Sequence, residues 1–351
     1  MEARVYLRRA AFLAWLDEVQ RAEKAEARAA LEALAEAVRN LPQGHSPLAA
    51  LSRGAEDDLT MRRDLLLRYL EKAARAYTAE RRRHYLRRLR QALTEVRTSA
   101  VNEINLNRWQ EYDEVWTDSL WLIEGRDRSG AHLGWYWGNF VPQIPRQLML
   151  RYTRRGDWVL DPFLGSGTTL IECRRLGRHG VGVELVEAVA QKARALIEQE
   201  PNPHGVETPV LVGDATALPL AGRFQLVVMH PPYHDILRFS EDARDLSNAP
   251  TVEAYLARWR QAVAQVAPLL ERGRYLAVVV GDKYVRGEWV PLGFRVMEVT
   301  MEAGFSLKSI VVKNFETTRG KRSQEALWRY RALAGGFYLF KHEYIFILKK
   351  R

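Results

Sequence analysis

The sequence predicts an α/β protein with a mostly parallel sheet, preceded by a region built only from helices. Two observations predict this class. From about residue 156, short apolar runs of strand length alternate with helical segments, which is typical of a parallel sheet covered by helices on both faces. In the first hundred residues, apolar side chains recur at helical spacing instead. We therefore expect two domains, residues 1–104 and residues 105–351.

The first domain shows the helical pattern in two stretches. Leu31, Leu34, Val38 and Leu41 follow one another at spacings of three or four, so they share one helix face. The same spacing returns within residues 86–96. We expect an all-helical region in which two long helices run antiparallel.

Arginines are interleaved with the second apolar stripe. They include Arg81, Arg82, Arg83, Arg87 and Arg88. The chain carries 53 lysines and arginines against 43 acidic residues, a formal net charge of +10. This surplus favours a polyanionic partner, because neutralising phosphates releases condensed counterions. We expect these arginines to bind nucleic acid, and we give equal weight to a solvated helix face or a contact between two copies.

The second domain contains seven apolar runs of strand length. They are Trp158–Asp161, Val181–Glu184, Val210–Gly213, Leu226–His230, Tyr275–Gly281, Leu307–Lys313 and Tyr344–Lys349. Helical patterns separate most of them, at Thr168–Leu176, Val186–Gln199, Thr251–Leu270 and Leu292–Ala303. The last two runs have no convincing helix between them. We therefore expect seven strands, the last of them reversed.

Some classes of protein are excluded by what the sequence lacks. Its one cysteine, Cys173, lies in a helix-like stretch and is expected to be a buried structural thiol, not part of a disulfide or a metal cluster. No apolar run approaches the roughly 18 residues of a membrane span, and the first residues lack a signal-peptide core. We expect a cytoplasmic protein without a metal.

A glycine-bearing turn follows the first strand of the sheet. Gly165 and Gly167 allow positive φ and a close approach of the backbone to a ligand, and Ser166 or Thr168 is placed to cap the next helix. Ligands of open parallel sheets bind beyond the carboxyl ends of the strands. The turn therefore indicates a cofactor site at this edge.

Two acidic residues extend this site. Glu184 ends the next strand, where a carboxylate can accept both hydroxyls of a ribose, and Asp214 follows the third strand, where it can accept from an adenine amine. Leu170 stands where a dinucleotide fingerprint has its third glycine, and the turn has no Gly-Lys-Ser/Thr. The pattern favours an adenosine cofactor without a pyrophosphate.

The fourth strand ends in His230-Pro231-Pro232-Tyr233. The prolines stop the strand and leave a stiff row of carbonyl acceptors, and Tyr233 offers a flat face for a planar base. The exocyclic amine of adenine or cytosine is a poor nucleophile, because its lone pair is delocalised into the ring. Acceptors for its hydrogens favour a pyramidal nitrogen that can attack a sulfonium methyl group, so positioning and electrostatics would carry the catalysis.

These motifs, in this order, resemble those of the DNA amino-methyltransferases, which modify adenine N6 or cytosine N4. The resemblance extends from about residue 130 to the C-terminus. It implies a Rossmann-like class I methyltransferase fold with a mostly parallel seven-stranded sheet, and S-adenosylmethionine as cofactor. It implies cofactor contacts from Asp161, Phe163, Gly165, Ser166, Gly167, Thr168, Glu184 and Asp214, and from Phe140 in the aromatic segment 132–142. It implies that His230, Pro231, Pro232 and Tyr233 are catalytic.

The resemblance also implies partners. The substrate would be double-stranded DNA with the target base flipped out, and a restriction endonuclease could act on the same sites. The protein would be a monomer or a homodimer. Arg238 and Phe239 are expected to border the flipped base, and Arg319, Lys321 and Arg322 to contact phosphates.

His230 departs from the family pattern, in which Asp, Asn or Ser opens the tetrapeptide. A neutral imidazole still has one acceptor nitrogen, so His230 can accept one amine hydrogen while the Pro231 carbonyl accepts another. We expect activity to fall as the pH drops through the pKa of His230. The substitution leaves the choice between adenine and cytosine open.

Two other functions are compatible with the residues. An RNA base methyltransferase shares the glycine turn and the Pro-Pro-aromatic element. A catalytically silent methyltransferase fold, kept as a nucleic-acid-binding subunit, would explain His230 but would have no need for Glu184 and Asp214.

Overall fold

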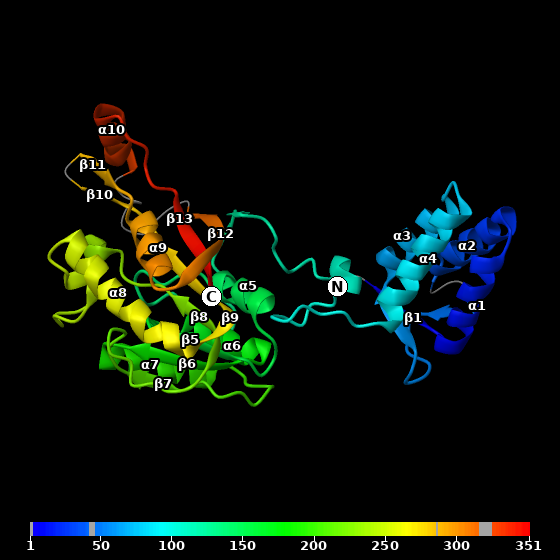
Figure 1. Ribbon diagram of the computed structural model, residues 1–351, viewed down its shortest axis with the longest axis horizontal. Helices are drawn as coiled ribbons and strands as arrows, with labels where there is room; N and C mark the ends of the chain where they lie inside the picture. Colours follow the sequence, from blue (N-terminus) through cyan, green and yellow to red (C-terminus); the bar gives the residue numbers. More distant parts are fainter. Residues whose placement is uncertain (1–2, 42–45, 286, 316–324) are drawn as a thin grey trace. The chain divides into compact units, whose positions relative to one another are not determined.

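The computed structural model describes residues 3–41, 46–285, 287–315 and 325–351. They form two compact units: Met1–Ala100 with Ile104–Glu114, and Val101–Glu103 with Val115–Arg351 (Figure 1). The chain thus passes between the units three times, between residues 100 and 115, whereas the sequence predicts a single boundary at residue 104. Within the described ranges, no helix combines the length and the apolar character needed to cross a membrane.

The first unit contains helices but is not all-helical, which corrects the expectation. Its helices are α1 (Arg9–Arg21), α2 (Lys24–Arg39), α3 (Arg63–Ala74) and α4 (Ala79–Thr94), with the short 3-10 helix η1 (Leu106–Glu111). The two predicted apolar stripes lie in α2 and α4, except for their last residues, Leu41 and Val96, which follow the ends of these helices.

A three-stranded antiparallel sheet completes the first unit. Its strands, in the order β2-β1-β3, are Ala49–Ala50, Arg4–Leu7 and Leu59–Arg62. Val5, Leu7 and Met61 are buried in the core of the unit. With at most four residues each, these strands are too short to show an alternating pattern in the sequence.

An eight-stranded sheet forms the centre of the second unit. Its order is β4-β12-β13-β9-β8-β5-β6-β7. The strands are β4 (Leu120–Trp121), β5 (Trp158–Asp161), β6 (His179–Glu184), β7 (Val210–Val212), β8 (Phe224–Met229), β9 (Leu270–Val280), β12 (Phe305–Asn314) and β13 (His342–Lys350). All seven predicted strands are confirmed, and the two-residue edge strand β4 is additional. β13 runs antiparallel to both its neighbours, as expected for the last strand, and the other pairings are parallel.

Helices cover both faces of this sheet. The buried cluster on one face joins the strands to α8 (Val252–Leu269) and α9 (Leu292–Glu302). The cluster on the other face joins them to α5 (Gln143–Tyr152) and to Cys173 of α6 (Thr168–Leu176). α7 (Glu187–Gln199) packs on α6 and on the β6–β7 end of the sheet. The α/β fold is therefore confirmed, and Cys173 is buried as expected.

Two elements were not predicted. α10 (Glu325–Gly335) lies between β12 and β13, where no helix was expected, and its side chains are largely exposed, so it lacks the apolar stripe that sequence patterns detect. The hairpin β10 (Lys283–Val285) and β11 (Glu288–Val290) lies beside it in Figure 1. Tyr284 of the hairpin stacks on Phe337, with ring centroids 4.1 Å apart.

Candidate active site

A cavity of about 940 Å³ opens at the carboxyl ends of the parallel strands. This is the edge at which open α/β sheets bind their ligands. The predicted site residues that line it are Phe140, Phe163, Gly165, Ser166, Glu184, Asp214, His230, Pro231, Pro232, Tyr233 and Phe239. The fold therefore brings the predicted cofactor turn and the predicted catalytic tetrapeptide into one cavity.

The glycine turn has the backbone that its sequence requires. Gly165 and Gly167 have φ values of +54° and +87°. A Cβ atom on Gly165 would come within 3.1 Å of the Tyr136 ring, and one on Gly167 within 2.9 Å of the Ile197 side chain. Both positions thus exclude a side chain by backbone conformation and by space.

The helix after the turn is not capped as predicted. Its N-cap is Gly167, and neither Ser166 nor Thr168 accepts a capping bond. Thr168 instead donates through Oγ1 to Asn139 Oδ1 at 2.9 Å, and Ser166 Oγ lies 3.2 Å from Thr168 Oγ1. A left-handed residue at the N-cap turns these side chains toward the aromatic segment instead of the helix end.

Glu184 connects the end of β6 to the glycine turn. Its Oε2 accepts from the backbone N–H of Gly165 at 2.9 Å, and its Oε1 accepts from that of Val186 at 3.0 Å. Burial raises the pKa of Glu184, and the two backbone bonds oppose that rise. Each carboxylate oxygen has a second lone pair for a ribose hydroxyl.

Asp214 follows β7 and lines the same cavity. Its Oδ1 accepts from both the backbone N–H and the hydroxyl of Thr216, each at 2.8 Å. These bonds hold one carboxylate oxygen and fix the orientation of the other. The arrangement suits an acceptor for an amino group.

Asp161 and Thr168, like Gly167, are predicted to bind the cofactor but do not line the cavity. Asp161 is buried and accepts from Thr169 Oγ1 at 2.5 Å and from the backbone N–H of Phe163 at 3.0 Å. Burial raises its pKa to about 7. In the structure both residues shape the turn, because their polar atoms bond to protein groups within it and beside it.

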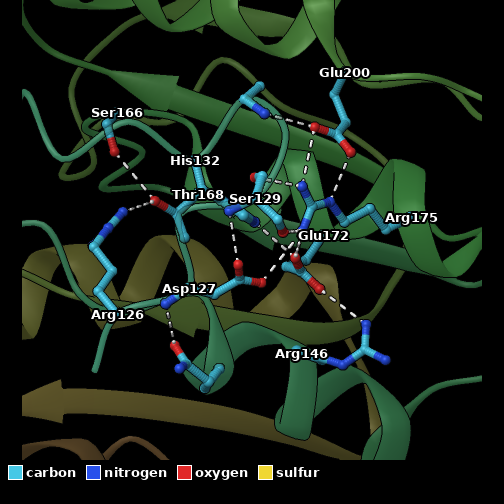
Figure 2. Close-up of polar contacts among 12 residues, drawn as sticks. Arg126, Asp127, Ser129, His132, Arg146, Ser166, Thr168, Glu172, Arg175 and Glu200 are labelled. Carbon is cyan, nitrogen blue, oxygen red and sulfur yellow. Dashed lines mark hydrogen bonds and ion pairs between the residues drawn. The ribbon is translucent and has the colours of Figure 1, made fainter. Parts of the chain in front are cut away.

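A network of polar contacts holds the aromatic segment against α6 (Figure 2). His132 Nε2 lies 2.7 Å from Glu172 Oε1, and Arg175 Nη1 lies 3.4 Å from the same oxygen and 3.5 Å from Asp127 Oδ2. Arg146 reaches the other oxygen of Glu172 at 3.6 Å. Asp127, His132 and Glu172 could together surround a cation, but the two guanidinium groups already neutralise the carboxylates.

Phe140 is positioned by this segment. Arg126 donates to the Phe140 carbonyl at 2.7 Å, and the Phe140 ring meets the His230 ring edge-on with centroids 5.0 Å apart. Phe140 therefore lies beside the tetrapeptide.

The cavity residues fit an adenosine cofactor such as S-adenosylmethionine. Glu184 and Asp214 are acceptors at the ends of adjacent strands, and Gly165 of the turn lines the same cavity. None of the described residues supplies the Gly-Lys-Ser/Thr phosphate cradle of a nucleotide triphosphate site. S-adenosylmethionine would supply an electrophilic methyl group on a sulfonium centre.

The tetrapeptide takes part in a buried polar chain. His230 Nε2 lies 3.0 Å from the Tyr233 hydroxyl, which donates to Glu343 Oε2 at 2.9 Å. Lys313 Nζ donates to Glu343 Oε1 at 3.0 Å. Burial opposes ionisation of Glu343, but the charge of Lys313 and the hydrogen bonds from Lys313 and Tyr233 outweigh it, and the pKa of Glu343 lies below its usual value.

Burial lowers the pKa of His230 to about 4. The imidazole is thus neutral at physiological pH and retains one acceptor nitrogen. The fall in activity expected from protonation of His230 is therefore placed near pH 4.

Tyr233 is held from two other directions. The neighbouring Pro232 carbonyl accepts from Tyr255 Oη at 2.9 Å. Gly281, at the end of β9, lies against the Tyr233 ring, where a Cβ atom would come within 3.1 Å. These contacts fix the position of the tetrapeptide from the side of β9 and α8.

The loop after the tetrapeptide contains the two residues predicted to border the flipped base, Arg238 and Phe239, and the structure places them differently. Phe239 lines the cavity and stacks on Tyr136, with centroids 5.7 Å apart. Arg238 is exposed and pairs with Glu241. Phe239 therefore borders the cavity, whereas Arg238 does not line it.

The predicted nucleic-acid-binding arginines of α4 differ in exposure. Arg81, Arg83 and Arg87 are exposed, and Arg88 is half-buried. Arg82 is buried and donates to the Ala22 carbonyl at 2.7 Å, so its assignment as a phosphate contact is wrong: its guanidinium ties α4 to α1. Arg319, Lys321 and Arg322 lie outside the described residues.

Sequence reasoning missed Glu343 and Lys313. They are directly paired across β12 and β13, and both are buried. A charged residue at the inward position of an apolar strand is the signal that could have found them. The pairing itself depends on strand register, which the sequence does not display.

Comparison with known proteins agrees with this geometry. The sequence profile of the DNA methylase family matches residues 51–195. The type II methyltransferase M.MjaII of Methanocaldococcus jannaschii is 40% identical over 84 residues, 22% of this chain and 16% of that protein. The type II methyltransferase M2.DpnII of Streptococcus pneumoniae is 34% identical over 99 residues, 27% of this chain and 34% of that protein.

These matches are partial. The chain spans between 16% and 34% of the length of these two relatives. A solved structure, TrmN from Thermus thermophilus, is 20% identical over 60% of this chain and 49% of that chain, with a TM-score of 0.40. The methylase profile and the curated relatives therefore show that part of this chain is similar to DNA methyltransferases.

Proposed function

We propose that this protein transfers a methyl group from S-adenosylmethionine to the exocyclic amine of adenine (N6) or cytosine (N4) in DNA. The observation that carries the proposal is the single cavity lined by Glu184, Asp214 and the His230–Tyr233 tetrapeptide. One part supplies acceptors for an adenosine cofactor, and the other supplies acceptors and a flat ring for a target base.

The proposed reaction is a direct displacement. The amine nitrogen forms a bond to the methyl carbon, the carbon–sulfur bond breaks with its electron pair going to sulfur, and a proton then leaves the nitrogen. His230 and the Pro231 carbonyl accept hydrogen bonds from the amine and favour a pyramidal nitrogen. Tyr233 stacks on the ring and holds the nitrogen in line.

His230 need not act as a strong base. Its lowered pKa, about 4, makes the neutral ring a poor proton acceptor at physiological pH. The methylated nitrogen is cationic until it loses a proton, and such a cation is acidic enough to release it to a weak base or to water. The role of His230 in this proposal is to accept a hydrogen bond.

DNA contacts in this proposal come from two places. The exposed arginines of α4, namely Arg81, Arg83 and Arg87, would neutralise phosphates. At the cavity, Phe315, Trp328 and Phe340 contribute aromatic lining beyond the tetrapeptide, and aromatic rings stack on bases without sequence preference. Phe239 would border the flipped base.

A labelling experiment tests the activity. Purified protein is incubated with S-adenosylmethionine tritiated on the methyl group, together with DNA lacking adenine and cytosine methylation or with total RNA. The nucleic acid is then digested and the labelled nucleoside identified. We expect label in deoxy-N6-methyladenosine or deoxy-N4-methylcytidine, and we expect a Tyr233→Ala variant to bind cofactor without transferring label.

Other outcomes point to other functions. Label only in ribonucleosides would make the protein an RNA methyltransferase. Cofactor binding without any transfer would favour a silent subunit, and the His230→Asp variant would then be the next protein to assay. Sedimentation with and without DNA would distinguish monomer from homodimer, and protection of methylated DNA from co-expressed nucleases would reveal a restriction partner.

A further inference from the structure

The polar chain behind the tetrapeptide has a defined direction. A lysine ammonium can only donate hydrogen bonds, and a carboxylate can only accept them. Lys313 therefore donates to Oε1 of Glu343, and the Tyr233 hydroxyl donates its one proton to Oε2, at 3.0 and 2.9 Å. The hydroxyl then has only lone pairs left for a third group.

His230 is that third group. Its Nε2 lies 3.0 Å from the Tyr233 oxygen. Because the hydroxyl proton is committed to Glu343, a hydrogen bond at this distance requires a proton on Nε2. In a neutral ring the other nitrogen, Nδ1, is then unprotonated and is an acceptor.

We propose that Glu343 is a positioning residue that acts through Tyr233 to hold neutral His230 in the tautomer with the proton on Nε2 and the acceptor at Nδ1. This rests on the proposed function, in which His230 must accept a hydrogen bond from the target amine. With the proton on Nδ1, the remaining free nitrogen would donate and would repel the amine.

Packing keeps the chain in one arrangement. Glu343 and Lys313 are buried, and they face each other across β12 and β13. Gly281 lies against one side of the Tyr233 ring, and Phe140 meets the His230 ring edge-on. These contacts hold both rings beside the polar chain.

The substitution Glu343→Gln should reverse the chain. Lys313 can only donate, so the amide oxygen must stay toward Lys313 and the amide NH₂ must face Tyr233. The NH₂ then donates to the tyrosine oxygen, which turns its proton toward His230 Nε2. His230 must accept there and carry its own proton on Nδ1, so the ring presents a donor to the target amine.

The first readout is the tautomer of His230 in the full-length protein. ¹⁵N NMR distinguishes protonated from unprotonated ring nitrogens, and a His230→Gln variant identifies the signals. We expect protonation of Nε2 in the natural protein and of Nδ1 in Glu343→Gln. A natural protein protonated on Nδ1, or the same tautomer in both proteins, would overturn the proposal. This readout needs no methyl transfer, so it is independent of whether the proposed activity is found.

The second readout is rescue of methyl transfer. Glu343→Gln should slow transfer by about 100-fold, comparable with the loss of one preorganised polar group in an active site. Tyr233→Phe keeps the ring but removes the hydroxyl, so it should slow transfer by only about 10-fold, since the two tautomers can then interconvert. The double variant should transfer methyl groups as fast as Tyr233→Phe, because without the tyrosine hydroxyl the amide of Gln at position 343 cannot change the tautomer of His230.

Two controls separate this role from loss of structure. Glu302→Gln removes one negative charge at an exposed ion pair with Arg260 and should leave transfer unchanged. Thermal unfolding and S-adenosylmethionine affinity are measured for each variant. A double variant that is slower than Glu343→Gln alone would mean that Glu343 only stabilises the site, and would refute the positioning role.

Discussion

Glu184 provides the sharpest test of the cofactor site. Both of its carboxylate oxygens accept backbone hydrogen bonds, from Gly165 at 2.9 Å and from Val186 at 3.0 Å. In Glu184→Gln one of these N–H groups must face an amide NH₂ instead of an oxygen. That end also loses its capacity to accept from a ribose hydroxyl.

The magnitude follows from these contacts. A hydrogen bond to a charged group contributes about 1.5–3 kcal/mol, and an unsatisfied buried donor costs about 1–3 kcal/mol. The loss of one charged ribose contact and the displacement of the Gly165 turn should together weaken cofactor binding by about 3 kcal/mol, or roughly 150-fold in Kd. Removing a charge whose burial raises its pKa offsets part of the stability loss, so folding should suffer less than binding.

Isothermal titration with S-adenosylmethionine measures this effect. The matched control is Glu187→Gln, three residues later, because Glu187 is exposed and accepts from the Gln191 side chain at 3.1 Å. We expect the control to bind normally. A Kd for Glu184→Gln within threefold of the natural protein would refute the assignment of Glu184 to the cofactor.

Three further predictions follow from burial and backbone geometry. Because the pKa of His230 is about 4 in the folded protein and 6.5 in its unfolded reference, its neutral form contributes stability that is complete above pH 6.5 and is lost as the pH falls toward 4. The loss is at most about 3 kcal/mol. In urea unfolding, the natural protein should therefore lose more stability between pH 7 and pH 4.5 than a His230→Gln variant, which has no imidazole to protonate. Methyl transfer by the natural protein should fall only near pH 4. Gly167→Ala should lower the free energy of unfolding, measured in thermal melts, by about 2 kcal/mol more than Gly205→Ala. Both glycines have positive φ, but only at Gly167 would the Cβ atom meet a neighbour, at 2.9 Å. Equal losses of stability in the two variants would contradict the steric argument. Replacing the three exposed arginines of α4 with alanine should reduce the slope of log affinity for DNA against log salt concentration by up to about 3. The control Arg82→Ala should destabilise the first unit without changing that slope. An unchanged slope for the triple variant would mean that the three arginines do not contact phosphates.

The strands and the cofactor turn could be predicted because their signals are local. A glycine needed for positive φ, an acidic residue at a strand end and an apolar run of four to six residues are each visible within a few positions. Gly165 and Glu184 were found in this way, and the structure then shows them joined by a hydrogen bond. Strand order and cavity formation follow from the same parallel topology.

The missed features depend on contacts between distant residues. Glu343 acquires its place only when β13 pairs with β12 and β9, and Arg82 is buried only because α4 packs on the carbonyl that ends α1. The strands of the first unit are too short for periodicity to register. The motif predicts that Asp161 and Thr168 contact the cofactor, but in the structure their side chains bond to Thr169 and Asn139 instead.

The threefold passage of the chain between its units has a practical consequence for dissection of the protein. Residues 101–103 belong to the second unit, where Asn102 donates to the Arg151 carbonyl at 2.7 Å and Glu103 pairs with buried Arg178 at 3.0 Å. A catalytic fragment that began at residue 105 would lack this clip and would expose the Arg178 guanidinium. Limited proteolysis within residues 104–114 would likewise leave residues 101–103 on the N-terminal fragment, so fragments of the second unit that start at residue 101 should be more stable than those that start after it.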